Sequence, residues 1–330
     1  MIKKTLKTSA LTIALAMASL PVYAQENLRL GHYFPAADFR GKTAQYFADA
    51  VDPELFKISV FPSESLVKGR DGFMATSRGT VDLYSLFGGY VVGSIDLMKI
   101  FTIPFPSEKF DDKAVLEFAN DPETIEIFNK QFEASNVKLL GFINSSGQTT
   151  IFLKDPIKSF KDLSGKKIRG VGGYTDPALQ DLGASVVFMS AAEQFLQLQT
   201  GGVDGVITTD SSYANQGLSE VAPIVIDGSI VRSPYPLIIN KRKWDSLTPE
   251  QQENINQAVQ STIEWSIHNF EAESARLQDV VTSQASEIYK LSGIDIEKSN
   301  EIRNKYLEKY ADEEGELGIE LVNIYNKYAN

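Results

Sequence analysis

The sequence predicts an α/β protein with two lobes, and three observations support this prediction. Strand-like and helix-like segments alternate, most clearly between Gly165 and Asp210, and such alternation is typical of βα units in a largely parallel sheet. Removing an amino-terminal leader of 24 residues from the 330 leaves 306, a length that suits two lobes better than one small core. A helix expected from about Glu250 to Leu291 would be roughly 60 Å long, which is longer than one lobe.

Residues 1–24 have the pattern of a cleavable signal peptide. Lysines precede an apolar stretch over 10–20, and small residues at 22 and 24 form a cleavage signal before Gln25. The apolar stretch is too short to span a membrane, and no later stretch reaches about 18 uninterrupted apolar residues. We therefore expect an exported, soluble mature chain.

The composition excludes several classes of site. The formal net charge of −11 argues against nucleic acid as a partner, because phosphate binding needs a basic surface. The chain has no cysteine, and its two histidines, His32 and His268, lie far apart in the sequence, so we expect no metal site. There is no G-x-S-x-G elbow and no Walker A sequence, and segment 170–175 lacks the last glycine of a dinucleotide fingerprint. We expect no cofactor and no catalytic residues, although a hydrolase built on scattered Ser and Asp side chains stays open.

The amino-terminal third predicts strand, helix and strand over 27–32, 39–51 and 57–61. Tyr33 follows the first strand, on a loop of the kind that lines a cleft, so it is a candidate binding residue. The alternative is that Phe34 belongs to the core and His32 is a hydrogen-bonded loop histidine.

A second strand-to-loop transition gives two further candidates. A helix over 70–78 and a strand over 80–84 lead into the loop 85–90. Gly88 would let the backbone approach a ligand closely, and Phe87 could stack on it. Phe87 is equally suited to a place in the core.

The middle of the chain predicts two helices, over 112–120 and 121–135, and then a strand over 137–143. The continuation of that strand should carry the chain into the second lobe, which makes Gln148 and Thr149 candidates.

Arg169 is the strongest candidate. It is expected at the carboxyl end of the strand 167–169, beside a helix that Asp176 and Pro177 would open. Open α/β sheets bind ligands at such ends, and a helix N-terminus favours an anion. A surface strand arginine is the alternative.

Two more candidates lie further along the chain. Thr208 ends a strand expected over 205–208, with Asp210 as the expected cap of the next helix. Tyr235 lies on a hinge or pocket-lining loop between strands expected over 224–227 and 237–240.

The long helix predicts how the lobes are joined. Thr248 and Gln251 have the spacing of a capping box. Irregular heptads weaken the alternative of a coiled-coil dimerisation helix. Two short helices are expected after it, over 299–308 and 315–328. The expected division is residues 25–146 plus 233–272 for lobe I and 147–232 plus 273–330 for lobe II.

The middle segments together resemble the periplasmic solute receptors of tripartite ATP-independent periplasmic (TRAP) transporters, the DctP-type family. The matching segments are Asp162-Leu163-Ser164-Gly165, Lys167-Ile168-Arg169, Leu182-Gly183-Ala184 and Leu198-Gln199-Thr200-Gly201-Gly202-Val203-Asp204-Gly205. The resemblance implies a two-lobe periplasmic-binding-protein-like fold whose long helix spans both lobes. It also implies a monomeric periplasmic receptor that binds a small organic acid through Arg169 and delivers it to the TRAP small and large membrane subunits.

One departure from the family pattern affects the expected ligand. Many relatives carry a second arginine on the strand that crosses between the lobes, and that position aligns with Thr149 here. We therefore expect a ligand with one anionic group and a neutral remainder. A receptor of the ATP-binding-cassette type is the alternative function.

Overall fold

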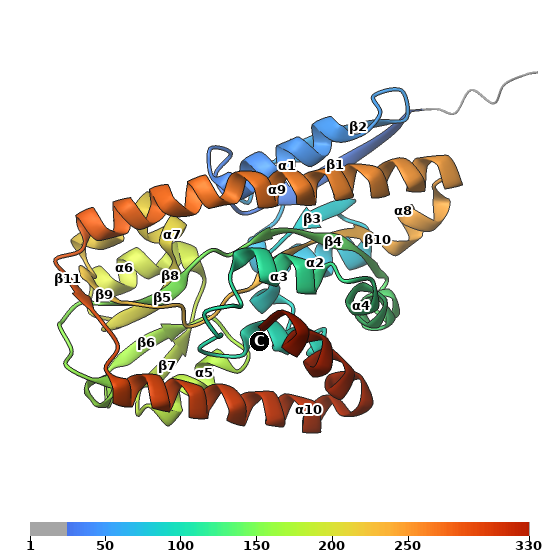
Figure 1. The fold of residues 1–330 in the computed structure, drawn as a ribbon. Coiled ribbons are helices and arrows are strands. Elements are labelled where there is room, and N and C mark those ends of the chain that lie inside the picture. The colour runs from blue at the N-terminus through green and yellow to red at the C-terminus, as the bar shows by residue number, and fades with distance from the viewer. Residues whose placement is uncertain (1–24, 330) are drawn as a thin grey trace, which may run out of the picture.

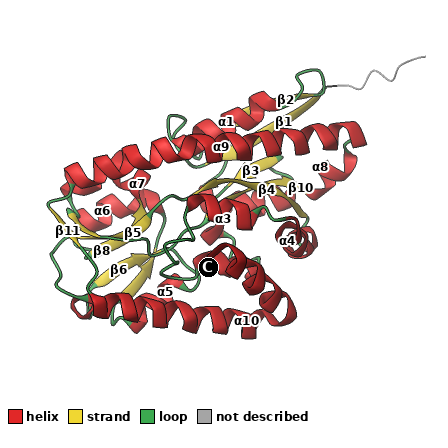
Figure 2. Cartoon of the chain, in the orientation of Figure 1, coloured by secondary structure: helices red, strands yellow, loops and turns green. Residues whose placement is uncertain are grey.

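The computed structural model describes residues 25–329, and the expected signal peptide lies outside this range. Two β-sheets lie end to end, with helices on their outer faces (Figures 1 and 2). No helix in the described range is long and apolar enough to cross a membrane. The predicted α/β class with two lobes is confirmed.

Lobe I is built on a five-stranded sheet in the order β2-β1-β3-β10-β4. Its strands are β1 (Glu26–His32), β2 (Phe56–Phe61), β3 (Leu83–Ser85), β4 (Val137–Ser145) and β10 (Pro234–Asn240). Strand β1 pairs in parallel with β2 and β3, whereas β10 is antiparallel to both β3 and β4. The chain therefore leaves lobe I along β4 and returns along β10.

Lobe II is built on a six-stranded sheet in the order β11-β9-β5-β8-β6-β7. Its strands are β5 (Thr149–Leu153), β6 (Lys167–Gly170), β7 (Ser185–Phe188), β8 (Gly205–Thr209), β9 (Ile224–Ile226) and β11 (Glu287–Tyr289). Strand β6 lies between β7 and β8, and both pairs are parallel. The carboxyl ends of these three strands therefore meet at one edge of the sheet.

The helices cover these sheets. They are α1 (Phe39–Ala50), α2 (Gly72–Arg78), α3 (Asp112–Ala119), α4 (Pro122–Ala134), α5 (Thr175–Asp181), α6 (Gln194–Gln199), α7 (Asp210–Asn215), α8 (Lys241–Ser246), α9 (Pro249–Gln284) and α10 (Gly293–Ala329). Helix α9 runs along both lobes (Figure 1). Val259, in its first half, belongs to a core of lobe I, and Val281, near its end, to a core of lobe II. Its apolar face is therefore buried within the chain.

The predicted start of α9 is confirmed, and its predicted end is wrong. The Thr248 hydroxyl accepts a hydrogen bond from the Gln251 amide at 3.2 Å, and the Gln251 side chain accepts one from the Thr248 amide at 3.0 Å. The helix ends at Gln284 rather than near 291, because the next residues form β11, which pairs in parallel with β9. Strand pairing between distant segments overrides the helical pattern here.

The carboxyl-terminal segment consists of two helical parts that meet at a kink at Gly315, where the second of the two predicted helices was expected to begin, while the first part begins at Gly293 rather than at 299. Gly315 interrupts α10 with φ 60° and ψ −138°, a conformation that is essentially restricted to glycine. After this kink, the Tyr325 ring packs against Phe110 and Phe118 of lobe I, at 4.5 and 5.7 Å between ring centroids. The lobe boundaries stay a prediction, but the end of the chain contacts lobe I as well as lobe II.

Two predicted helix caps are wrong. Helix α7 is capped by Thr209, whose hydroxyl accepts from the Ser212 amide at 3.1 Å, while Asp210 lies in the first turn. Helix α5 begins at Thr175, so Asp176 lies inside it and accepts from the Gly172 amide at 2.9 Å. Asp210 therefore lies one residue beyond the capping position of α7, and Asp176 two residues beyond that of α5, which is Tyr174.

Candidate functional site

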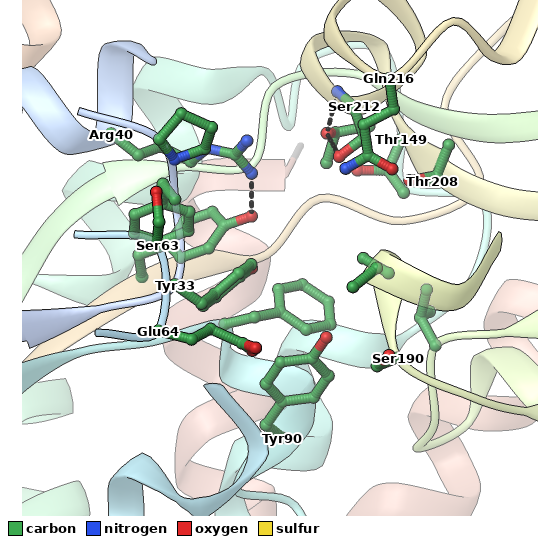
Figure 3. Close-up of a pocket in the computed structure, with 18 of the residues that line it drawn as sticks. Tyr33, Arg40, Ser63, Glu64, Tyr90, Thr149, Ser190, Thr208, Ser212 and Gln216 are labelled. Atoms are coloured by element: carbon green, nitrogen blue, oxygen red, sulfur yellow. Dashed lines mark hydrogen bonds between the residues drawn. The ribbon is translucent and has the colours of Figure 1, made fainter. Parts of the chain in front are cut away.

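A cavity of about 300 Å³ lies between the two lobes. One wall comes from lobe I and is mainly aromatic, with Tyr33, Phe34, Phe87, Tyr90 and Tyr235. The facing wall comes from lobe II and is mainly polar, with Thr149, Arg169, Thr208, Thr209, Ser212 and Gln216. Figure 3 shows Tyr33 and Tyr90 on one side and Thr208 and Gln216 on the other. The cavity therefore offers a ligand one apolar face and one polar face.

Arg169 lies at the carboxyl end of β6, where its neighbours fix its direction. Ile168 is fully buried in the core, and the chain then turns sharply through Gly172 and Gly173, both with positive φ. A Cβ at Gly173 would collide with the Thr102 side chain of lobe I. This turn therefore brings the end of β6 against the opposite lobe, as a ligand site between lobes requires.

The Arg169 guanidinium is buried without a counter-ion. It is 3% exposed, and it donates to the Met189 carbonyl oxygen from Nε at 3.2 Å and to the Ile207 carbonyl oxygen from Nη1 at 2.5 Å. No carboxylate within residues 25–329 forms an ion pair with it, and its Nη2 has no hydrogen-bond partner there. Burial lowers the pKa of Arg169 from its ordinary value, but arginine stays protonated in proteins. The cavity wall therefore carries a positive charge that no ion pair within residues 25–329 neutralises, although Asp176 acts on it at longer range.

Two polar groups on the lobe II wall also lack hydrogen-bond partners among the described residues. The Thr208 hydroxyl has no hydrogen-bond partner among the described residues, although the side chain is only 4% exposed. The Gln216 oxygen accepts from Gln194 Nε2 at 2.8 Å, which leaves the Gln216 NH₂ group without a partner in the described part of the chain. Both groups can contact polar atoms of a ligand held at Arg169.

The aromatic rings of lobe I form one continuous surface. Phe87 lies 5.5 Å from Tyr90 and 5.8 Å from Tyr235, and Tyr33 lies 5.7 Å from Tyr90, between ring centroids. Such a surface favours a flat or apolar ligand body over a strongly hydrated one.

A second buried arginine in the wall, Arg40, was missed by the sequence reasoning. It is 7% exposed, and Asp38 pairs with it at 2.8 Å from both Nε and Nη2. Its Nη1 donates to the Tyr235 hydroxyl at 2.9 Å (Figure 3). An arginine in the first turn of an amphipathic helix is usually exposed, so the sequence carries no signal that this one points inward.

The structure places six of the eight candidates on the cavity wall. They are Tyr33, Phe87, Thr149, Arg169, Thr208 and Tyr235. Gln148 lies elsewhere: its side-chain oxygen accepts from Gln278 of α9 at 3.4 Å, because successive residues of an extended chain point to opposite sides. Gly88 also lies off the wall, since a Cβ there would be 2.8 Å from Ser233 Oγ. Gln148 and Gly88 therefore do not line this cavity, and the binding roles of all eight candidates stay predictions.

His32 differs from the hydrogen-bonded loop histidine considered as an alternative. It lies on β1, is 1% exposed, and neither ring nitrogen has a hydrogen-bond partner among the described residues. Burial lowers its pKa to about 4, so the ring is neutral at pH 7. It stacks on Phe34 at 5.3 Å between ring centroids. The His32 ring therefore packs against a residue of the aromatic wall.

Two side-chain contacts join the lobes outside the cavity lining. Ser211 of lobe II donates to Asp38 of lobe I at 2.6 Å. Arg70 of lobe I lies over the Phe188 ring of lobe II, 4.5 Å from its centroid. These contacts link side chains of the two lobes.

The sequence of this chain is similar to those of bacterial solute-binding proteins. Residues 30–314 match the family model of the bacterial extracellular solute-binding proteins, family 7 (DctP). The ectoine-binding periplasmic protein TeaA of Halomonas elongata is 25% identical, over 98% of this chain and 95% of that protein.

Two solved structures share the fold. A Bordetella pertussis extracytoplasmic solute receptor binding pyroglutamic acid, DctP6, has a TM-score of 0.83 at 17% identity, covering 92% of this chain and all of the other. A TRAP periplasmic solute-binding protein of Rhodoferax ferrireducens with bound malonate has a TM-score of 0.79 at 22% identity, covering 91% of this chain and 98% of the other.

Proposed function

Because this chain belongs to the bacterial extracellular solute-binding proteins of family 7, the solute receptors of TRAP transporters, we propose that it captures a small organic acid between its lobes. Receptors of this family bind small ligands in the periplasm and work with TRAP membrane components. Family members are transport proteins. We accordingly infer that this chain binds its ligand without transforming it.

The observation that carries the proposal is the buried Arg169 guanidinium, which forms no ion pair within residues 25–329 and has no hydrogen-bond partner there for Nη2. A buried charge is costly unless it is paired. A carboxylate from a ligand would supply the missing charge and accept the free Nη2 donors, and arginine can bind it with two parallel hydrogen bonds. Thr208 and Gln216 would then contact polar atoms close to that carboxylate.

The size and lining of the cavity limit the rest of the ligand. A volume of about 300 Å³ is at the small end of ligand pockets. The continuous aromatic wall of Tyr33, Phe87, Tyr90 and Tyr235 favours a compact body with a flat or apolar face. The pyroglutamic acid of the Bordetella receptor is a ligand of this general size, with one carboxyl group.

The location and partners of the chain follow from the same family membership. We propose that residues 1–24 are removed as a signal peptide and that the mature chain acts in the periplasm as a monomer. The closed form would then dock on the TRAP small and large membrane subunits, and nucleic acid would not be a partner.

The proposal is tested by a thermal-shift screen of the mature chain. The panel contains monocarboxylates, dicarboxylates and sugar acids, with neutral sugars as controls. A ligand at 100 times its dissociation constant stabilises the folded state by about 2.7 kcal/mol, which raises the melting temperature by several degrees. We expect at least one acid to shift the wild type and not Arg169→Ala. Shifts from neutral compounds alone would contradict the proposal.

A further inference from the structure

The cavity wall contains two buried arginines with different surroundings. Arg169 has no carboxylate partner, whereas Arg40 is paired with Asp38 through two 2.8 Å hydrogen bonds. A receptor with two free arginines could hold two carboxylates. The state of Arg40 therefore decides how many anionic groups the cavity can accept.

We propose that Asp38 sets the charge of the ligand: by neutralising Arg40, it restricts the cavity to solutes with one anionic group. This inference rests on the proposed function, in which a carboxylate binds Arg169. It assigns the restriction to Asp38, a residue that no sequence pattern singled out.

Hydrogen bonds within the protein occupy most of the Arg40 guanidinium. An arginine has five N–H donors. Nε and Nη2 each donate to Asp38, Nη2 also donates to Ser211 at 3.3 Å, and Nη1 donates to Tyr235 at 2.9 Å. Four of the five donors thus have partners, and one on Nη1 remains. A second ligand carboxylate could not form a two-bond contact with Arg40 while Asp38 stays in place.

Asp38 is itself fixed in the ionised form. Its Oδ1 caps helix α1 by accepting from the Arg40 amide at 2.9 Å, and its Oδ2 accepts from Ser211 at 2.6 Å. Burial alone would raise the pKa of Asp38, but the charge and hydrogen bonds of Arg40, with Ser211, lower it well below its ordinary value. The pair therefore keeps zero net charge across the physiological pH range.

The remaining lining residues add no second positive charge. Thr149 is neutral, and its hydroxyl donates to Ser146 Oγ at 3.3 Å. Glu64 is acidic, although it lies at the exposed rim, where it accepts from the Gly69 amide at 2.9 Å. A dicarboxylate would leave its second charge buried and unpaired, which disfavours binding.

The test compares each of three dicarboxylates with its monoamide, which has the same shape and one charge fewer. The pairs are malonate and malonamate, succinate and succinamate, and glutarate and glutaramate. Affinities are measured by isothermal titration at pH 7.5. We expect the wild type to bind the best monoamide at least tenfold more tightly than its diacid.

The informative variant is Asp38→Asn. Asparagine caps a helix as well as aspartate does, and its one oxygen can keep the bonds from the Arg40 amide and Nε. The substitution removes the charge together with the second acceptor, which Arg40 Nη2 and Ser211 use in the wild type. We expect the affinity ratio of diacid to monoamide to rise at least tenfold. The double variant Asp38→Asn with Arg40→Gln should return the ratio towards the wild-type value. The control is Asp82→Asn, since Asp82 pairs with the half-exposed Arg29 outside the cavity.

The outcomes separate this inference from the proposed function. Wild-type affinity for diacids that equals or exceeds that for monoamides, or an unchanged ratio in Asp38→Asn, would overturn the role of Asp38 and leave carboxylate capture intact. Failure of the acid screen itself would instead contradict the proposed function.

Discussion

Individual side chains in this protein combine burial with incomplete pairing. Arg169 is buried with no counter-ion, Thr208 is buried with a free hydroxyl, and His32 is buried with both ring nitrogens unpaired. Arg169 and Thr208 face the cavity, where a ligand can supply the hydrogen-bond partners that they lack. His32 lies behind the aromatic wall, where burial keeps its ring neutral. The stability of the folded state therefore depends on pH through His32.

The pKa of His32 predicts a loss of stability in acid. The pKa is about 4 in the folded protein and about 6.5 in an unfolded chain. Between these values the unfolded state binds more protons, so the free energy of unfolding falls as the pH falls. The expected loss from His32 is about 2 kcal/mol between pH 7 and pH 5.

Urea unfolding of the wild type and His32→Phe at both pH values checks this expectation. The stability of the wild type relative to the variant should decrease by about 2 kcal/mol on going to pH 5. The matched control, His268→Phe at an exposed position, should show no such trend. A wild-type to His32→Phe difference that is the same at both pH values would refute the assignment.

At the scale of single residues, the sequence predicted Arg169 and not Arg40. Arg169 follows a short strand and precedes glycines and a helix, and this order by itself places a side chain at the ligand-binding edge of a sheet. Arg40 has no such context. Gln148 and Thr149 show a different limit, because the sequence predicts an extended segment without fixing which of two neighbours faces the cavity.

Helices and strands were predicted well where local patterns decide them. The capping box of Thr248 and Gln251 gave the start of α9, and apolar spacing gave α1 and α4. The end of α9 was missed because β11 exists only through pairing with β9, about 60 residues earlier in the chain. The cap of α5 was misassigned by two residues and that of α7 by one, since several polar residues compete at those positions.

The kink in α10 gives a prediction at this scale. Gly315 has φ 60° and ψ −138°, so Gly315→Ala should lower the free energy of unfolding by about 1–3 kcal/mol. Gly293, at the start of the same helix, lacks a positive φ, and a Cβ there would meet nothing within 4 Å. Gly293→Ala should therefore be neutral or slightly stabilising. Equal changes in the free energy of urea unfolding for the two substitutions would show that the kink does not require glycine at position 315.

The whole molecule is arranged so that one cavity depends on both lobes. The strands β4 and β10 carry the chain between the two sheets, and α9 packs on both. The two-lobe class and the long helix followed from sequence length and helical pattern. Of the aromatic wall, Tyr33, Phe87 and Tyr235 were candidates in the sequence, whereas Phe34 was not, because an apolar ring in a loop carries no signal that separates a cavity wall from a core.

Contacts between the lobes predict the behaviour of the closed state. The Arg70 side chain lies over the Phe188 ring, which is 44% exposed at the end of β7. We expect this contact between the lobes to be lost when they separate, and an exposed cation–π contact contributes about 0.5–1 kcal/mol. Phe188→Ala should therefore weaken ligand binding about two- to fivefold, mainly through faster dissociation.

Stopped-flow kinetics with an acid from the screen measures this effect. Leu196→Ala is the control, because Leu196 is also exposed in lobe II. If the dissociation rate of Phe188→Ala equals that of the wild type, the Arg70–Phe188 contact does not stabilise closure.

The most direct test of the account is isothermal titration of wild type and Arg169→Ala with the strongest-binding acid and with its primary amide. Removing one partner of a buried ion pair typically costs about 3–5 kcal/mol, so Arg169→Ala should lose at least about a hundredfold in affinity for the acid. The amide should bind the wild type weakly, and Arg29→Ala, on the surface of lobe I, should bind the acid like the wild type. Equal affinity of wild type and Arg169→Ala for the acid would contradict the claim that this receptor recognises its ligand through a carboxylate at Arg169.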